Sequence, residues 1–259
     1  MERILYNGIG AALPVTPAGD TFYYSDYRIG GGMKVYYKSA WPCCAGTYFQ
    51  AVADYPNLIY YRDAASLYVN LFVPSEVTWN GPAGRVKLVQ ETSYPETETS
   101  RLTLQLEQPT RFPLRFRVPT WSRGVTVKVN GADFPVIAQP GTWAAVERNW
   151  HSGDRLELHI PLTFHLQAVD RQHPDRVAVM RGPVVMIMEG EWQETQFKLP
   201  KTDAEFENML VADQTPGWFQ VRQPGGGFNH SKFRPFYTQP ERVPYYMYFD
   251  KGSLPVVMW

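Results

Sequence analysis

Alternation of apolar and polar residues constrains the fold of this chain more than any other feature of its sequence. At residues 66–73, in "SLYVNLFV", the apolar residues Leu67, Val69, Leu71 and Val73 occupy every second position. Four later stretches repeat the pattern: "RLTLQLEQ", "FPLRFRVP", "VTVKVNG" and "DRLELHIPL". Because successive side chains of a strand point to opposite faces, each stretch predicts a strand with one face available for a core.

Turn residues separate these predicted strands. The stretch "VTVKVNG" ends at Asn130-Gly131, a dipeptide typical of tight β-hairpins. The 22 prolines and 20 glycines also indicate frequent turns. Strands with one apolar face, joined by turns, are typical of a β-sandwich, which we place at residues 66–165. Aromatic residues make up 15% of the chain, and their flat rings favour a carbohydrate ligand.

The two ends of the chain differ from this middle segment. Residues 1–65 contain two predicted helices, in "ERILYNGIGAAL" and "AGTYFQAVADY", with a predicted hairpin between them. They hold too few apolar positions for a core of their own, so we expect them to be the end of something larger. Residues 166–259 include strand-like runs broken at Gly182-Pro183 and predict a second, smaller β-module. The predicted fold is mainly β, with β-sandwich modules after a short helical and hairpin segment.

The charge balance disfavours two classes of partner. The 25 basic and 25 acidic residues cancel, so no overall field would attract nucleic acid or an anionic membrane surface. No run approaches the roughly 18 apolar residues of a membrane span. The first residues lack the charged-then-apolar order of a signal peptide. We therefore expect neither nucleic acid nor a membrane as partner; the compartment is unknown, with the cytoplasm favoured.

Both cysteines of the chain stand side by side, as Cys43 and Cys44 in "SAWPCCAGTY". Four interpretations are open. A disulfide between neighbours needs a strained ring, two buried thiols would act as small apolar groups, and two thiolates would supply half of a tetrahedral zinc shell. A thiolate just before a helix is also a suitable nucleophile, because the unpaired amides of the helix N-terminus favour negative charge. The spacing alone does not choose among them.

The histidines give a weaker signal. They are scattered, with no two at a ligand-like spacing on one helix: His151, His159, His165, His173 and His230. We expect His159 and His165, which lie in or beside predicted strands, to pack or to form surface hydrogen bonds.

Several motifs follow one another over nearly the whole of residues 2–190. They are "ERILYNGIGAAL", "FYY" at residues 22–24, the cysteine pair, "LYVNLFVPSE", "FRVPTWS", "VKVNG", "RNWHSGDRLELHIPL" and "VAVMRGPVV". Their content and order resemble the C-terminal half of glycoside hydrolase family 127, the β-L-arabinofuranosidases. The resemblance implies that residues 1–65 are the C-terminal remnant of an (α/α)6 catalytic barrel, followed by the β-sandwich and the second β-module.

The same resemblance assigns roles to three residues. By position, Cys43 is the nucleophile that attacks the anomeric carbon, and Cys43 and Cys44 both bind a zinc ion. Zinc would keep the thiolate ionised near neutral pH. Tyr24, in "FYY", matches a tyrosine near the sugar. The family's remaining zinc ligands, a glutamate and a cysteine, and its glutamate acid/base all lie upstream of this segment.

The surroundings of the cysteine pair depart from the family's pattern. Trp41 stands where the family has a further cysteine, and Ala45, Gly46 and Thr47 replace two prolines and an asparagine. The sugar and the linkage are therefore open.

The upstream ligands and the acid/base have no counterpart in this chain. We therefore expect a fragment of a longer protein, or a chain that works beside a partner supplying the N-terminal barrel, in cis or in trans. Glu76 and Glu2 are the nearest carboxylates in sequence that could replace the acid. Such carboxylates are more often solvated surface groups.

Two functions follow from these motifs. In the first, the chain is the C-terminal part of a retaining glycoside hydrolase that acts on β-L-arabinofuranosides or related plant glycans through a zinc-bound cysteine. That chain would be inactive alone and would bind zinc only with the upstream ligands. The alternative is a non-catalytic β-sandwich module for structural support or carbohydrate binding.

Overall fold

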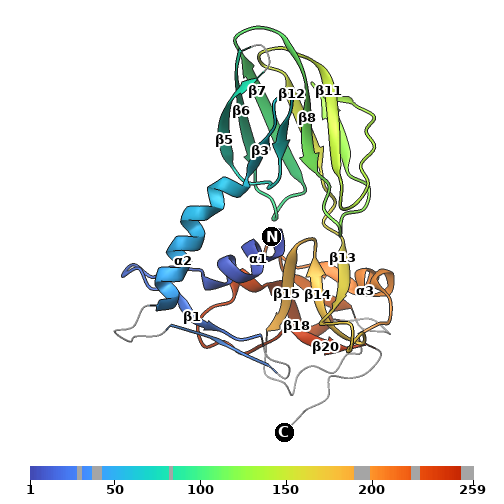
Figure 1. Cartoon of the computed structure of the whole chain (residues 1–259). Coiled ribbons are helices and arrows are strands. Elements are labelled where there is room, and N and C mark those ends of the chain that lie inside the picture. The colour runs from blue at the N-terminus through green and yellow to red at the C-terminus, as the bar shows by residue number, and fades with distance from the viewer. Residues whose placement is uncertain (28–30, 37–42, 82–83, 190–198, 223–227, 252–259) are drawn as a thin grey trace. The chain divides into compact units, whose positions relative to one another are not determined.

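The structure, a computed structural model, describes residues 1–27, 31–36, 43–81, 84–189, 199–222 and 228–251. For residues 23–24, 43–45 and 228–231 it describes the backbone alone. The chain forms two compact units, one of residues 53–162 and one of residues 1–52 together with 163–259. Strands predominate in both units (Figure 1), so the predicted mainly β fold is confirmed.

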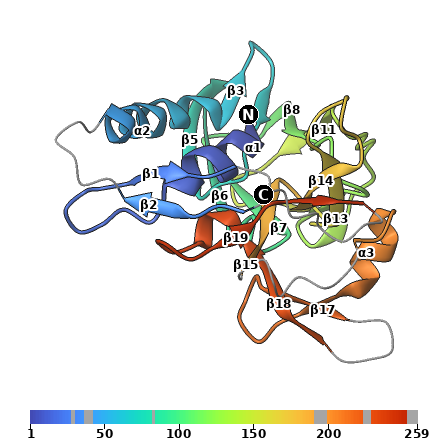
Figure 2. The ribbon, with the colours of Figure 1, turned by 90° about the horizontal axis from the view of Figure 1, so that it is seen from below.

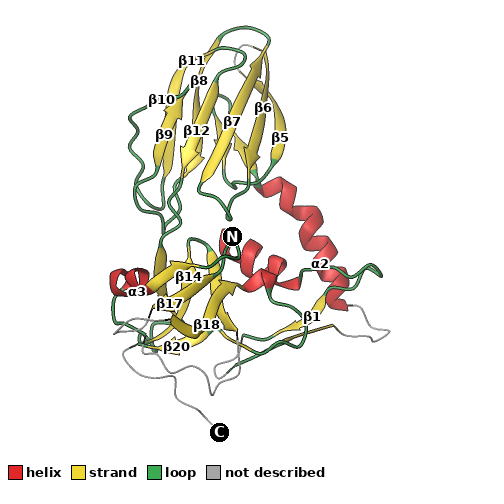
Figure 3. Ribbon diagram, turned by 180° about the vertical axis from the view of Figure 1, so that it is seen from behind, coloured by secondary structure: helices red, strands yellow, loops and turns green. Residues whose placement is uncertain are grey.

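Residues 53–162 form a β-sandwich. Its larger sheet has the strand order β10-β9-β12-β7-β6-β5, with all neighbours antiparallel. Its smaller sheet has the order β11-β8-β4-β3, in which β4 runs parallel to β8. Figure 3 shows the two sheets of this unit as two layers. In chain order the elements are η3 (Tyr55–Leu58), β3 (Tyr60–Arg62), β4 (Leu67–Val69), β5 (Ser75–Gly81), β6 (Gly84–Thr92), β7 (Thr99–Leu106), β8 (Thr110–Arg117), β9 (Thr126–Val129), β10 (Ala132–Asp133), β11 (Trp143–Trp150) and β12 (Arg155–His159).

The alternation of the sequence places the core of this unit between the two sheets. Leu114 and Phe116 of β8 and Leu156 and Leu158 of β12 have no exposed surface. Burial of each such side chain contributes roughly 1.5–3 kcal/mol to folding. The indole of Trp150 is equally buried, and its Nε1 donates a hydrogen bond to the carbonyl of residue 112 at 3.0 Å.

The predicted hairpin at Asn130-Gly131 is confirmed. These residues join β9 to β10 with φ angles of 51° and 84°, the left-handed conformations that a tight hairpin requires. The predicted strand at residues 66–73 is wrong in its second half. Strand β4 ends at Val69, and Phe72, expected on the polar face, is only 1% exposed. The reason is a turn of the chain, in which the amides of residues 70 and 71 both donate to the carbonyl of Ile59.

The other unit contains a second sheet. Its strand order is β13-β14-β15-β18-β17-β16, and β19 pairs with β15 while β20 pairs with β14. Helix α3 packs Phe206 against Phe164 and Phe233, with ring centroids 6.3 and 5.6 Å away. The elements are β13 (Phe164–Ala168), β14 (Arg176–Arg181), β15 (Val184–Glu189), α3 (Asp203–Met209), β16 (Leu210–Ala212), β17 (Phe219–Arg222), β18 (Phe228–Pro235), η5 (Phe236–Thr238), β19 (Tyr245–Tyr246) and β20 (Tyr248–Asp250).

A helical segment at residues 2–12 packs on this second sheet, as α1 (Glu2–Ile4), the π-helical turn η1 (Leu5–Ile9) and the 3-10 turn η2 (Gly10–Ala12). Asn7 holds it there. The side-chain amide of Asn7 donates to the carbonyl of Pro183 at 2.8 Å and accepts from the amide of Val185 at 2.7 Å. The predicted N-terminal helix is confirmed. The division into residues 1–65, 66–165 and 166–259 stays a prediction.

The predicted hairpin and second helix complete this part of the chain. Strand β1 (Phe22–Ser25) pairs antiparallel with β2 (Lys34–Tyr36), and Figure 2 shows both beside α1. Helix α2 (Cys43–Asp54) begins at Cys43, two residues before the stretch "AGTYFQAVADY" in which the sequence predicts a helix. In the described part of the chain, no helix combines the length and the apolar character needed to cross a membrane.

Candidate functional site

Helix α2 carries the cysteine pair in its first turn. The sequence predicts Cys43 and Cys44 just before a helix, and the structure includes both residues in it. The amides of a first helical turn have no intrahelical acceptors, so they favour a negatively charged group nearby. The side chains of both cysteines lie outside the described residues. Their roles as nucleophile and zinc ligands therefore stay predictions.

Tyr24 lies in strand β1, where its backbone pairs with that of Val35. The strand is anchored on two sides. The hydroxyl of Ser25 donates to the carbonyl of Ala11 at 3.2 Å, and the ring of Phe22 stacks on that of Tyr36 with centroids 4.1 Å apart. The side chain of Tyr24 lies outside the described residues, so its contact with a sugar stays a prediction.

A groove of about 630 Å³ lies between α2, β1 and the N-terminal helical segment. Helix α2 contributes Thr47, Tyr48 and Ala51, which begin one turn beyond the cysteine pair. Ser25, the neighbour of Tyr24, also lines it. The fold therefore brings the chain segments of the predicted site residues to one place, which we call the α2 groove. Its other lining residues are Ile4, Gly8, Ile9, Ala12, Phe22, Asp26 and Tyr27.

Tyr27 is a polar residue of the α2 groove that no sequence motif singled out. Its hydroxyl donates a hydrogen bond to the carbonyl of Asn7 at 2.5 Å. Burial, and to a lesser degree the neighbouring Tyr248, raise the pKa of Tyr27 to about 12. The phenol therefore stays protonated at neutral pH and can donate a hydrogen bond but not serve as a base.

Asp26 is the only carboxylate among the described lining residues of the α2 groove. Its backbone carbonyl accepts a hydrogen bond from the hydroxyl of Tyr245 at 2.5 Å, and its Oδ2 accepts a weak one from the amide of Met33 at 3.4 Å. A Cβ atom at Gly32 would lie 2.5 Å from the Cβ of Asp26. Glycine at position 32 is thus required for this close approach. The sequence feature that could have indicated Asp26 as a site residue is its position two residues after Tyr24.

The two carboxylates considered as substitute acids have other surroundings. Glu76 lies in β5 of the sandwich, and its carboxylate forms a surface ion pair with Lys87 at 2.8 Å. This is the solvated role that such groups usually have. Glu2 begins α1, is 7% exposed and does not line the α2 groove.

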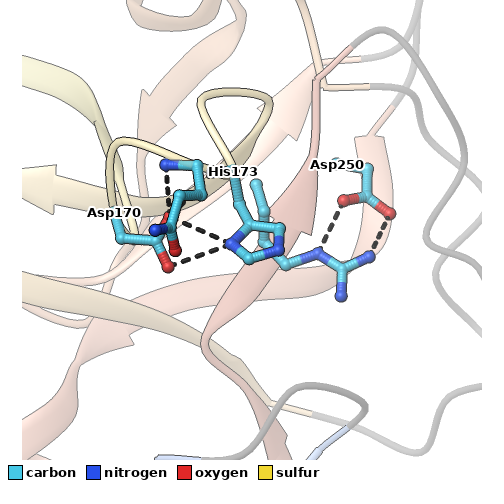
Figure 4. Close-up of polar contacts among 5 residues, drawn as sticks. Asp170, His173 and Asp250 are labelled. Carbon is cyan, nitrogen blue, oxygen red and sulfur yellow. Dashed lines mark hydrogen bonds and ion pairs between the residues drawn. The ribbon is translucent and has the colours of Figure 1, made fainter.

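His173 forms a contact that superficially resembles a catalytic pair. Its Nδ1 lies 2.9 Å from Oδ1 of Asp170, and Figure 4 shows the two side chains facing each other. The same Oδ1 accepts hydrogen bonds from the amides of residues 172 and 173. The side-chain bond with His173 first, and then these two amide bonds, lower the pKa of Asp170. The nearby Asp250 instead binds Arg176, at 2.8 and 3.0 Å. Asp170 and His173 therefore stabilise an exposed turn between β13 and β14.

Among the residues that the structure describes, no group of three or more histidine, cysteine, aspartate or glutamate side chains could hold a metal ion. Cys43 and Cys44 are not covered by that finding, because their side chains lie outside the described residues. Zinc binding by the cysteine pair thus stays a prediction.

Comparison with known families matches residues 66–162 to the GH127 middle domain of β-L-arabinofuranosidases. The matched residues coincide with most of the observed sandwich, and the resemblance seen in the sequence motifs is confirmed. No curated protein matches the chain.

Solved structures share the fold over nearly the whole chain. A GH127 β-L-arabinofuranosidase from Geobacillus stearothermophilus T6 is 22% identical with a TM-score of 0.74, over 97% of this chain and 45% of that one. A protein described as a glycoside hydrolase is 21% identical with a TM-score of 0.71, over 97% and 48%. A GH127 β-arabinofuranosidase is 20% identical with a TM-score of 0.69, over 96% and 45%. The chain spans less than half the length of these structures.

Proposed function

This chain contains a domain related to the GH127 β-L-arabinofuranosidases, and on that premise we propose that it is the C-terminal portion of a retaining glycoside hydrolase. The match of residues 66–162 to the family's middle domain carries the proposal. The substrates would be β-L-arabinofuranosides or related plant glycans. Because the chain spans less than half of its solved relatives, the proposal includes an N-terminal barrel, supplied in cis or in trans.

In this proposal Cys43 is the nucleophile. Its sulfur forms a bond to the anomeric carbon while the bond from that carbon to the leaving oxygen breaks, and a carboxylic acid of the barrel protonates that oxygen. Water then displaces the sulfur, with the resulting carboxylate as base, so that the anomeric configuration is retained. The place of Cys43 in the first turn of α2 supports this role, because helix amides favour the thiolate.

Cys43 and Cys44 together would hold zinc. Cysteine thiolates are suitable ligands for this metal, and the pair supplies two of the usual four. When bound, zinc keeps a ligating thiolate ionised near neutral pH. The other two ligands would come from the barrel. Tyr24 would contact the sugar, since β1 borders the same α2 groove as the helix that begins with the cysteines.

Exposed apolar side chains support the need for a barrel. Ile4 is 67% exposed on the N-terminal helical segment, and Phe49 and Val52 of α2 are 53% and 41% exposed. Ile4 also lines the α2 groove. Further barrel helices packed against these two segments would cover such side chains.

The test measures hydrolysis of an aryl β-L-arabinofuranoside by the 259-residue chain, alone and with the barrel portion of a GH127 relative supplied in trans. We expect the chain alone to match its Cys43→Ser variant, because the acid/base and two zinc ligands are absent. With the barrel, we expect hydrolysis that Cys43→Ser reduces by a factor of about 1,000 or more. Cys44→Ser should lower the zinc content, and Thr120→Ser, an exposed change in the sandwich, should alter neither.

Two results would contradict this proposal. Hydrolysis by the isolated chain well above the Cys43→Ser control would contradict its inactivity alone. Hydrolysis by the assembled protein that Cys43→Ser leaves unchanged would contradict the role of Cys43.

A second candidate function is a non-catalytic sandwich module that supports a neighbouring domain or binds carbohydrate. The separate core of residues 53–162 favours it, because this unit buries its apolar residues between its own two sheets. If the assembled protein binds no zinc and Cys43→Ser has no effect, this second function replaces the first.

A further inference from the structure

The outer face of the smaller sandwich sheet carries a group of aromatic side chains. The strand register places Tyr61 of β3 beside Tyr68 of β4, and Tyr68 beside Arg115 of β8. Leu67 and Val69, on either side of Tyr68, are buried. Since strand side chains alternate between faces, Tyr68 and its two cross-strand neighbours point away from the core.

Trp143 of β11 completes this group. Its ring centroid lies 5.1 Å from that of Tyr68, with the ring planes 89° apart, and 6.5 Å from that of Tyr61, with the planes 75° apart. Trp143 and Tyr61 are each 38% exposed. The indole ring of Trp143 is therefore nearly perpendicular to both phenol rings. We call this group of three side chains, Tyr61, Tyr68 and Trp143, the aromatic face.

Asp63 supplies a fixed carboxylate beside the aromatic face. Its Oδ1 accepts from the amides of Ala65 and Ser66 at 2.8 and 2.6 Å, and its Oδ2 accepts from the hydroxyl of Tyr68 at 2.7 Å. These bonds, the one from Tyr68 first, lower the pKa of Asp63. An ionised carboxylate has about four acceptor sites, so it can also accept from hydroxyl groups of a ligand.

Arg115 supplies donors on the other side of Tyr68. Its guanidinium carbon lies 5.6 Å from the ring centroid of Tyr68, and its Nε is 3.5 Å from the hydroxyl of Ser66. Within the described ranges, no carboxylate forms an ion pair with Arg115. The guanidinium can therefore donate to a ligand without first breaking such a pair.

We propose that the aromatic face, together with Asp63 and Arg115, binds a carbohydrate chain. The C–H faces of sugar rings pack on tyrosine and tryptophan, while the carboxylate and the guanidinium bind their hydroxyl groups. A protein partner fits less well, because a specific interface buries about 800 Å² on each side, far more than three partly exposed rings offer.

The proposed carbohydrate site shares no residue with the proposed catalytic site at Cys43. It lies wholly within residues 53–162 and uses no residue of the α2 groove. It rests on the proposed function only for its ligand class, a plant-type glycan. Binding can therefore be measured on a protein that does not hydrolyse.

The test is affinity electrophoresis of the 259-residue chain in gels that contain soluble arabinan, a neutral polymer. We expect the chain to be retarded, and Trp143→Ala and Tyr61→Ala each to weaken binding about tenfold or more. Arg115→Ala should weaken it about threefold to tenfold. Ile137→Ala, which removes an apolar side chain that is 82% exposed in the same unit, is the matched control and should bind as the wild type does.

Three outcomes would overturn the proposal. They are no retardation of the wild type, equal loss of retardation in Ile137→Ala, and retardation by acidic polygalacturonate alone that Arg115→Ala abolishes and Trp143→Ala does not. Circular dichroism establishes that each variant is folded, and Trp143→Phe should retain part of the binding. Cys43→Ser should bind arabinan normally, so failure of this proposal and failure of the proposed hydrolase are distinguishable.

Discussion

Gln90 in the sandwich and Lys34 in the other unit are both buried polar side chains, but they differ in how their polar atoms are compensated. In the sandwich, Gln90 is 2% exposed and is hydrogen-bonded at both ends of its amide. Its Nε2 donates to the carbonyl of Leu71 at 3.1 Å, and its Oε1 accepts from the hydroxyl of Ser100 at 2.9 Å. Both polar atoms of the Gln90 amide therefore have hydrogen-bond partners within the sandwich, which offset the loss of water on burial.

In the other unit, Lys34 of β2 has no exposed surface. Its Nζ lies 4.5 Å from the ring centroid of Phe236 and 5.2 Å from that of Phe22, and it has no hydrogen-bond partner among the described residues. The two rings stabilise the cation only in part. The comparison teaches that the sandwich compensates the buried amide of Gln90 with its own groups, whereas the other unit contains a buried amine whose charge depends on pH.

The largest effect on stability should come from removing the hydrogen bonds of the buried Gln90 side chain in the sandwich. Gln90→Leu keeps the size of the side chain but leaves the carbonyl of residue 71 and the hydroxyl of Ser100 without this partner. We expect the free energy of unfolding to fall by roughly 2–4 kcal/mol, measured by urea denaturation. Gln105→Leu, the same change at an exposed position of the adjacent strand, should stay within about 0.5 kcal/mol. Equal losses in both variants would show that these hydrogen bonds are not the cause.

A smaller effect, of opposite sign, should follow when the buried amine is removed. Burial, and to a lesser degree Arg234, lower the pKa of Lys34 from 10.5 to about 7. Between these two values the unfolded chain binds a proton that the folded chain does not, so the stability of the wild type should rise with pH across that range. Below pH 7 the folded state holds a buried cation, and its full cost is present.

Lys34→Met should therefore raise the free energy of unfolding by roughly 1–3 kcal/mol at and below about pH 7. The gain should shrink as the pH rises from 7 through 10.5, above which the wild-type amine is neutral in both states. Denaturation series at several pH values measure this, with the exposed Lys201→Met as control. A gain that does not change with pH would mean that better packing, and not the charge, stabilises the variant.

The smallest effect should come from the sandwich surface. Glu76→Gln removes the ion pair with Lys87, in which the side chain of Glu76 is 64% exposed. We expect a loss of no more than about 0.5 kcal/mol, reduced further by salt. In the assembled protein the same variant should hydrolyse as the wild type does. A large loss of hydrolysis would instead restore Glu76 as a candidate acid.

Local patterns predicted the sandwich well. Period-two runs identified Leu114 and Phe116 as core residues, because a strand with one apolar face can bury only that face. The Asn130-Gly131 dipeptide identified the hairpin between β9 and β10, since asparagine and glycine adopt the left-handed conformation at little cost in free energy. Phe72 was misplaced because the chain turns after Val69, where hydrogen bonds to residue 59 end the strand.

The candidate site was less predictable, because its geometry depends on contacts between distant segments. The motifs named Cys43, Cys44 and Tyr24, but they did not indicate that α2, β1 and residues 4–12 border one groove. Asp26 and Tyr27 gain their positions from partners 7 to 219 residues away in sequence. No pattern of local periodicity contains such pairings.

The bonds of Asn7 to β15 have a consequence for the order in which this protein forms during synthesis. The amide of Val185, which Asn7 binds, is 178 residues further along the chain. A ribosome therefore completes every strand of the sandwich before it makes the partner of the N-terminal helical segment. Hairpins such as β5–β6 and β6–β7 join near neighbours and can close early, whereas a long loop delays the closing contact. The sandwich thus folds first. The helical segment, which includes the exposed Ile4, docks only after residues 163–189 have been synthesised.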